Sequence, residues 1–402
     1  MLLMNVYLQG LSALAYYRNN GTATDVERCA ADIRSMEDAT SSRTALVDAG
    51  VWRLGIGEPT VDHPFEVLLH DGSQRARSKA VKARVWTTPV APTAFRTARK
   101  GIYVSSPEFV FQQMATRLDL PELIALGMEL CGTYRREVRV PHLDSDEVGF
   151  TTLYHQRVLT TPKRLRGFLT SMRPAPGCGK ALKALEYVLP NSASPMETAL
   201  YLLLCLPRRY GGYALPKPIL NPPIAISKSG RKHTLRKSAK PDLFWREIRL
   251  DLEYNSDEFH EENQRAIDSM RRKALERMKV EVIELTPDEL LSVELFHATA
   301  LRIALRFKKR IRPEHEGGFD ERRLELRGAL FSDIQTEKDT AYEPVEDDAS
   351  TLDTWDIWVD QAPDSNPEFL ETWVTDETWD AELLDAEDEG LYVFGADKSR
   401  GT

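Results

Sequence analysis

Apolar residues follow two spacings along the first half of the chain, and each spacing predicts a different kind of element. Short runs of alternating apolar and polar residues predict strands within residues 51–55, 65–72, 82–88 and 100–106. Apolar residues three and four positions apart predict helices at residues 4–18, 23–37, 106–118, 119–135, 161–172 and 179–189. Ser106 and Asp119 each stand just before a proline-containing first turn, a typical helix start. An α+β region is therefore expected here.

The segment from Ser192 to Leu290 has a different order of elements. A helix over residues 194–206 is followed by a proline-rich extended stretch at 214–226. Two short strands, at residues 242–245 and 250–254, are joined by the turn REIR, and a long helix and a strand follow at 257–279 and 280–285. A further helix over residues 289–311 closes this part. The order of helices and strands predicts an α/β domain.

Charge divides the chain unevenly. Residues 341–402 hold 19 acidic residues against only Lys398 and Arg400, a net charge of −17, whereas the other 340 residues have 43 acidic and 51 basic residues, a net of +8. This composition predicts a largely disordered acidic tail, which contains four of the seven tryptophans, after a basic body suited to a nucleic-acid partner. No apolar run is long enough for a membrane span, and the four cysteines are scattered. The protein is therefore expected in a reducing, cytoplasmic compartment, without a membrane partner.

The hairpin at residues 242–254 brings two acids together. If its turn centres on Glu247 and Ile248, Leu243 faces Leu252 and Asp242 faces Glu253. Opposed residues in a sheet have side chains on one face, about 5 Å apart at Cβ. Two carboxylates so placed repel each other, and a divalent cation such as Mg²⁺ or Mn²⁺ is one natural compensator. The alternative is a solvent-facing strand edge whose charges happen to oppose.

The same register predicts Lys240 opposite Asn255. A lysine beside two metal-binding carboxylates can orient or deprotonate water, or stabilise developing charge on a phosphate.

The pieces SPMETALYLLL, KPDLFW, LDLEYNSDEFH and AIDSMRRKALERMKVEVIEL occur in an order that resembles the endonuclease-like domains related to the very-short-patch repair enzyme, within the PD-(D/E)XK superfamily. The resemblance implies a helix acid at Glu197, a strand aspartate at Asp242 and a glutamate on the next strand at Glu253. It implies a histidine at His260 and a helix pair at Asp268 and Arg271, with Leu275. These acids would be the catalytic and metal-binding centre.

One position departs from that pattern. The family has E-x-D-G where this chain has Glu253-Tyr254-Asn255-Ser256, so Asn255 brings an amide in place of a charge. Without the resemblance, Glu197 is read as an acid favoured by a helix N-terminus, and His260 as a capping or surface residue.

Basic residues near this segment are candidates for nucleic-acid binding or for an ordinary solvated surface. They are Arg231, Lys232, Arg236 and Lys237 in the loop SKSGRKHTLRKSAK, and Arg271, Arg272 and Lys273 on the long helix. The basic residues of TPKRLRGFLTSM and GKALKALEYVL have the same two interpretations.

The first half resembles AbiEi-type antitoxins, on the pieces KARVWTT, KGIYVSSPEFVFQQMATRL and LPELIALGMELCG. Together the resemblances and the element pattern imply an antitoxin-like region at 1–165, a helical connector at 166–190, a restriction-endonuclease-like domain with a mixed sheet flanked by helices at 191–312, a helical extension at 313–340 and the acidic tail at 341–402.

The leading expectation is a Mg²⁺-dependent nuclease acting on nucleic acid, chiefly DNA, in a toxin–antitoxin or phage-defence setting. The alternatives are a DNA-binding antitoxin-type regulator that has lost activity, favoured by Asn255, and a protein-binding module that works through the tail. The tail is also expected to compete with nucleic acid for the basic surface.

Overall fold

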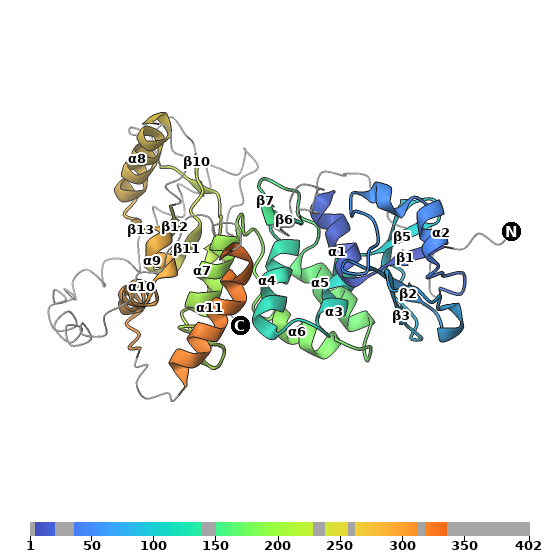
Figure 1. The fold of residues 1–402 in the computed structure, drawn as a ribbon. Coiled ribbons are helices and arrows are strands. Elements are labelled where there is room, and N and C mark those ends of the chain that lie inside the picture. Colours follow the sequence, from blue (N-terminus) through green and yellow to red (C-terminus); the bar gives the residue numbers. More distant parts are fainter. Residues whose placement is uncertain are drawn as a thin grey trace, which may run out of the picture. The chain divides into compact units, whose positions relative to one another are not determined.

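The computed structural model describes residues 5–20, 36–138, 150–227, 238–255, 262–311 and 318–335 (Figure 1). These residues divide into two compact units. The first holds residues 5–20, 36–138, 150–221, 242–255, 283–311 and 318–335, and the second holds 222–227, 238–241 and 262–282. None of the helices in this described part is long and apolar enough to cross a membrane.

A five-stranded mixed sheet begins the first unit. Its strands are β1 (Val6–Leu8), β2 (Phe65–Leu69), β3 (Val81–Val85), β4 (Phe95–Arg99) and β5 (Ile102–Ser105), in the order β3-β2-β1-β5-β4. β1 runs parallel to β5 and antiparallel to β2, and β2 runs parallel to β3. Strand pairing, with all three residues of β1 buried, thus corrects the helix predicted over 4–18, which begins only at Gly10. The strand predicted at 51–55 is also wrong, because Val51–Leu54 is the 3₁₀ helix η1 between two left-handed glycines.

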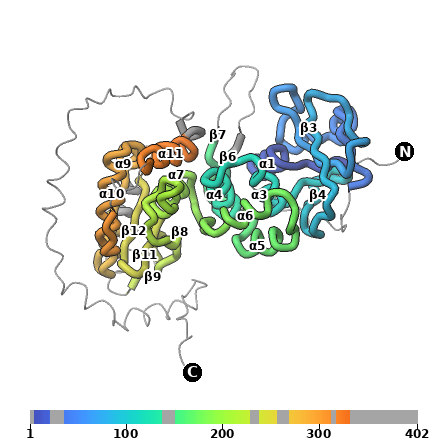
Figure 2. The backbone as a smooth tube through the Cα atoms, turned by 90° about the horizontal axis from the view of Figure 1, so that it is seen from below, coloured from blue at the N-terminus to red at the C-terminus, as the bar shows by residue number. Residues whose placement is uncertain are grey.

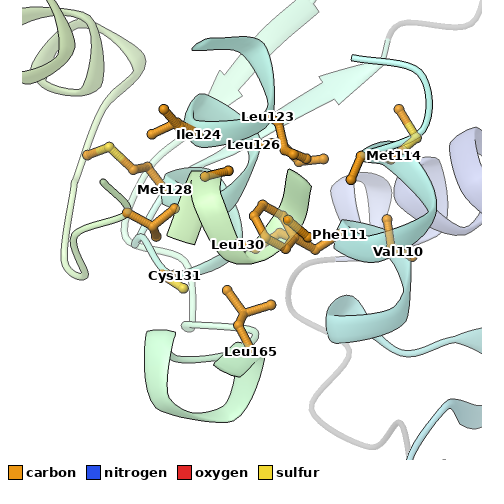
Figure 3. Close-up of a cluster of buried hydrophobic side chains, with 14 of the residues drawn as sticks. Val110, Phe111, Met114, Leu123, Ile124, Leu126, Met128, Leu130, Cys131 and Leu165 are labelled. Carbon is orange, nitrogen blue, oxygen red and sulfur yellow. The ribbon is translucent and has the colours of Figure 1, made fainter. Parts of the chain in front are cut away.

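Helices α1 (Gly10–Asn19), α2 (Arg43–Asp48), α3 (Pro107–Met114) and α4 (Leu120–Leu130) accompany this sheet, and α5 (Pro162–Ser171) and α6 (Cys178–Leu185) follow. A short 3₁₀ turn, η2 (Gly72–Gln74), follows β2, and β6 (Arg135–Val138) pairs antiparallel with β7 (Phe150–Leu153). The predicted helix starts are confirmed: the side chains of Ser106 and Asp119 accept hydrogen bonds from Phe109 N and Glu122 N. Apolar side chains of α3, α4 and α5 belong to one buried cluster (Figure 3).

A four-stranded sheet is formed by strands from the later part of the chain. It contains β8 (Ile219–Leu220), β11 (Leu243–Trp245), β12 (Leu250–Tyr254) and β13 (Glu281–Leu285), in the order β13-β12-β11-β8. The helix α7 (Pro195–Cys205) precedes it, and the 3₁₀ turns η3 (Arg208–Tyr210) and η5 (Arg246–Ile248) lie before β8 and between β11 and β12. Leu243, Trp245, Leu250 and Leu252 belong to the same buried core as α7.

Helices α9 (Pro287–Leu291), α10 (Val293–Arg306) and α11 (Phe319–Gln335) complete the first unit, with α11 beside α7 (Figure 2). The long helix predicted at 289–311 is thus two helices, since Ser292 ends α9 and caps α10.

The second unit contains a two-stranded pairing and one long helix. β9 (Ile224–Ala225) pairs antiparallel with β10 (Ser238–Ala239), and α8 spans Glu262–Arg277.

Taken with the two larger sheets and their helices, the described residues have an α/β fold with mixed sheets flanked by helices, as predicted.

Candidate active site

The β11–β12 hairpin has the register that its sequence predicts. Leu243 pairs with Leu252, Phe244 with Asp251 and Trp245 with Leu250. Continued by one residue beyond β11, this register puts Asp242 opposite Glu253, on the face that does not carry Leu243 and Leu252. The backbone N–H of Tyr254 donates a hydrogen bond of 2.9 Å to Oδ2 of Asp242, which holds this carboxyl against β12. By this register the two acids share one face of the hairpin, with Asp242 directly before β11 and Glu253 on β12.

Glu197 is connected to these strands through Asn221. Both the backbone N–H of Ala193, at 2.8 Å, and the side-chain amide of Asn221, at 2.5 Å, donate to Oε2 of Glu197. The backbone N–H of Asn221 donates to the carbonyl of Asp242, at 3.0 Å. Asn221 therefore joins the helix acid to the strand that bears Asp242.

Burial and a neighbouring charge set the protonation of Glu197. Its side chain is 6% exposed, and loss of solvation raises its pKa. The negative charge of Asp242 raises it further, while hydrogen bonds from Ala193, Asn221 and Ser194 oppose the rise, and the resulting pKa is about 7. Near neutral pH, this carboxyl is able both to bind and to release a proton.

A polar network fixes the start of α7, where Glu197 lies. The Oγ of Ser194 caps the helix by accepting from Glu197 N at 3.0 Å. The hydroxyls of Ser192 and Thr198 are 2.8 Å apart, and that of Tyr134 lies 3.1 Å from Thr198. Because Ser192 and Thr198 are also buried, the first turn of α7 is held from several directions. The Glu197 side chain is thereby preorganised.

Two residues of this site were not predicted from sequence. Asn221 has a left-handed backbone (φ +50°) directly after β8, which asparagine tolerates better than most residues. The pair Asn221-Pro222 after a short apolar strand was the available signal. Asp251 is fully buried opposite Phe244, on the face that also carries Glu253. Its alternation with Glu253 along β12 was visible in the sequence.

The other predicted residues lie at different places. Lys240 is exposed directly after β10, and since Ser238 and Ala239 pair with β9, the segment before Lys240 belongs to another ladder than β11. Asn255 is half-buried at the end of β12, and its backbone N–H donates to the carbonyl of Leu285 at 2.9 Å.

The candidate nucleic-acid residues are only partly described. On α8, in the second unit, Arg272 and Lys273 are exposed, Arg271 is half-buried and Leu275 is buried. Asp268 lies within this helix. The following predicted residues fall outside the described part of the chain: Arg231, Lys232, Arg236, Lys237 and His260.

The oxygen donors suit a hard divalent cation. Mg²⁺ is usually held by one or two carboxylates, with waters and substrate phosphates completing its coordination. Asp242 and Glu253 supply two carboxylates on one face. Across the residues that the structure covers, no three His, Cys, Asp or Glu side chains form a group able to hold a metal ion. The predicted metal-binding acids Asp242, Glu253 and Glu197 thus do not form such a three-residue group, and Asp242 and Glu253 are the two that would hold a cation.

Comparison with known proteins yields no relatives: no protein-family model, no curated protein and no solved structure matches this chain.

Proposed function

We propose that this protein is a Mg²⁺-dependent nuclease of the PD-(D/E)XK type that hydrolyses phosphodiester bonds, with DNA as its substrate. The observation that carries the proposal is the joining of three acids: Asp242 and Glu253 on one face of a hairpin, and Glu197 linked to Asp242 through Asn221. The order of elements agrees with it. In the four-stranded sheet, β8, β11 and β12 follow α7 in the chain, and β13, which follows α8, lies beside β12.

Asp242 and Glu253 would hold the cation, together with phosphate oxygens of the substrate. When bound, Mg²⁺ neutralises charge on the phosphate and favours deprotonation of water. The hydrogen bond from Tyr254 N keeps the Asp242 carboxyl in place for this role.

Glu197 is proposed to take the proton of the attacking water. Its two hydrogen bonds from Ala193 and Asn221 both reach Oε2, so Oε1 is the oxygen proposed to exchange the proton. The water oxygen bonds to phosphorus, the phosphorus–oxygen bond to the leaving nucleoside breaks, and the leaving oxygen is protonated from solvent. A base with a pKa near 7 suits this step at neutral pH.

Cleavage of a supercoiled plasmid and of a short labelled duplex, with Mg²⁺, Mn²⁺ or EDTA, tests the proposal. Metal-dependent cleavage that is lost in Asp242→Asn supports it. Retained cleavage in that variant, or none by the native chain with either metal, contradicts it.

Asn255 favours a second candidate, a DNA-binding regulator with a nuclease-like fold and no activity. An amide stands at the position where the resembling family has a carboxylate, which lowers the negative charge available to a cation. Duplex binding that is equal with Mg²⁺ and EDTA, without cleavage, identifies this case.

A further inference from the structure

A long stretch of the first unit carries positive charge with no acid to offset it. Residues 148–185 contain seven Lys and Arg residues and no Asp or Glu. Within this stretch, Lys163, Arg164 and Arg166 are exposed on α5, and we call these three the α5 basic face. Exposed Arg157 and Arg173 flank the helix along the chain. In the part of the chain that the structure covers, none of these five residues forms an ion pair.

The opposite side of α5 fixes the direction of this face. Leu165, Phe168 and Leu169 are buried in the core of the first unit. The helix itself lies beside α3 and α6 (Figure 1). The nearest acid on α3, Glu108, is buried and accepts a hydrogen bond from Thr160 Oγ1 at 2.5 Å. It therefore leaves the outward charge of the α5 basic face unbalanced.

A glycine lies in the middle of this face. Gly167 is within α5, where glycine weakens a helix relative to alanine, and a Cβ built there meets no atom within 4 Å. Packing therefore does not explain this glycine. At helical spacing it lies beside Lys163 and Arg164, four and three residues earlier, and it directly follows Arg166. Without a side chain, it leaves the helix backbone open beside these cations. Close approach of a large anion is one use of such a surface.

The first turn of α5 also carries unbalanced positive charge. It contains no acid and holds Lys163 and Arg164, although bases are disfavoured near the partial positive charge of a helix N-terminus. A bound polyanion would offset this cost.

We propose that the α5 basic face binds the phosphate backbone of a nucleic acid, which lies across Gly167. This surface is separate from the acidic site, and the inference rests on the proposed function only in its choice of nucleic acid as the polyanion. Binding measured in EDTA does not depend on cleavage, so its failure is distinguishable from failure of the nuclease proposal.

The test is fluorescence anisotropy of the full chain with a labelled duplex of about 30 base pairs in EDTA, over a range of salt. The test variant is Lys163→Gln/Arg164→Gln/Arg166→Gln. The control is Arg75→Gln/Arg77→Gln/Lys79→Gln, which removes three positive charges that are also exposed, from the loop before β3. Each lost phosphate contact lowers the slope of log K against log salt by about 0.9. The α5 variant is expected to bind about 10- to 100-fold more weakly, with a slope smaller by up to about 3, and the control is expected to change little.

A second variant separates contact from folding. Gly167→Gln removes no charge and is favoured by helix propensity, so its thermal stability is expected to equal or exceed that of the native chain. Weaker duplex binding is expected nevertheless, because the side chain occupies the place of the backbone phosphates. Equal losses in the α5 and control triples, or native binding by Gly167→Gln, overturn the proposal. Tighter binding by the α5 triple also overturns it, since this result indicates that the acidic residues 341–402 occupy the face.

Discussion

The side-chain amide of Asn221 donates a hydrogen bond of 2.5 Å to Oε2 of Glu197, while the backbone N–H of the same asparagine donates to the carbonyl of Asp242. One residue thus sets the position of a helix acid relative to a strand acid. Since Asn221 is 6% exposed, water does not readily replace these bonds. The chemistry proposed for the site depends on this connection.

The two hairpin acids are expected to be essential for cleavage and dispensable for binding. Asp242→Asn or Glu253→Gln should reduce Mg²⁺-dependent cleavage at least about 100-fold, because each removes a carboxylate proposed to hold the cation. Duplex binding in EDTA should stay equal or become tighter, since repulsion of phosphate falls. Gel-based cleavage and anisotropy check this, with exposed Glu247→Gln as the matched control. Lost binding together with lost cleavage would indicate misfolding instead.

Glu197 is expected to make stability fall as pH rises. Its pKa is raised from 4.5 to about 7 in the folded protein, so the folded state binds more protons than the unfolded state between these values. The contribution of Glu197 to the free energy of unfolding is fully present below about pH 4.5. It is lost as pH rises through about 7, by an amount on the order of 3 kcal/mol. Glu197→Gln should remove this dependence in urea unfolding measured from pH 4.5 to 8.

Asp242→Asn provides the control for that measurement. It removes the charge that helps to raise the Glu197 pKa, so the loss of stability should move to lower pH. Identical pH profiles in the native chain and Glu197→Gln would contradict both the raised pKa and the proposed proton transfer.

Asn221→Gly is expected to shift the pH dependence of cleavage. Glycine accepts the left-handed backbone at this position but removes the amide donor, which lowers the Glu197 pKa in the native chain. The rising limb of the pH–rate profile should therefore move to higher pH. Stability should fall by about 1–3 kcal/mol, because a buried carboxylate loses a donor. An unchanged profile would show that Glu197 is not the titrating base.

Asn255→Asp tests the departure from the resembling family. An added carboxylate at the end of β12 should raise Mg²⁺-dependent cleavage if the native site is a weakened nuclease. The rate with saturating Mg²⁺ is the measurement, and Asn255→Ser is a neutral control. Absence of cleavage in both the native chain and Asn255→Asp would favour the regulator.

Removal of the acidic segment is expected to tighten nucleic-acid binding. Residues 341–402 carry a net −17 beside a body of +8, so they should compete with phosphate for basic residues such as Arg271, Arg272 and Lys273. Truncation after Thr340 should increase duplex affinity most at about 50 mM salt, with the gain shrinking as salt rises. Equal affinity at low salt would leave the segment as a spacer or solubilising extension.

The sequence by itself determined the parts of the fold that depend on neighbouring residues. The register of β11 and β12 follows from a short turn and from strict alternation, so it was predictable that Asp242 and Glu253 share a face. The starts of α3 and α4 follow equally from Ser106 and Asp119, whose caps act within three residues.

Only the tertiary structure decided the features that depend on distant residues. Val6–Leu8 continues an apolar pattern that suits a helix, yet pairing with Ile102–Val104 makes it a buried strand. Likewise, no local pattern joins Asn221 to Glu197, and burial in the folded chain is what raises the Glu197 pKa. Strand pairing and loss of solvation act between residues that are far apart in the chain, so the protonation of the site is a property of the fold.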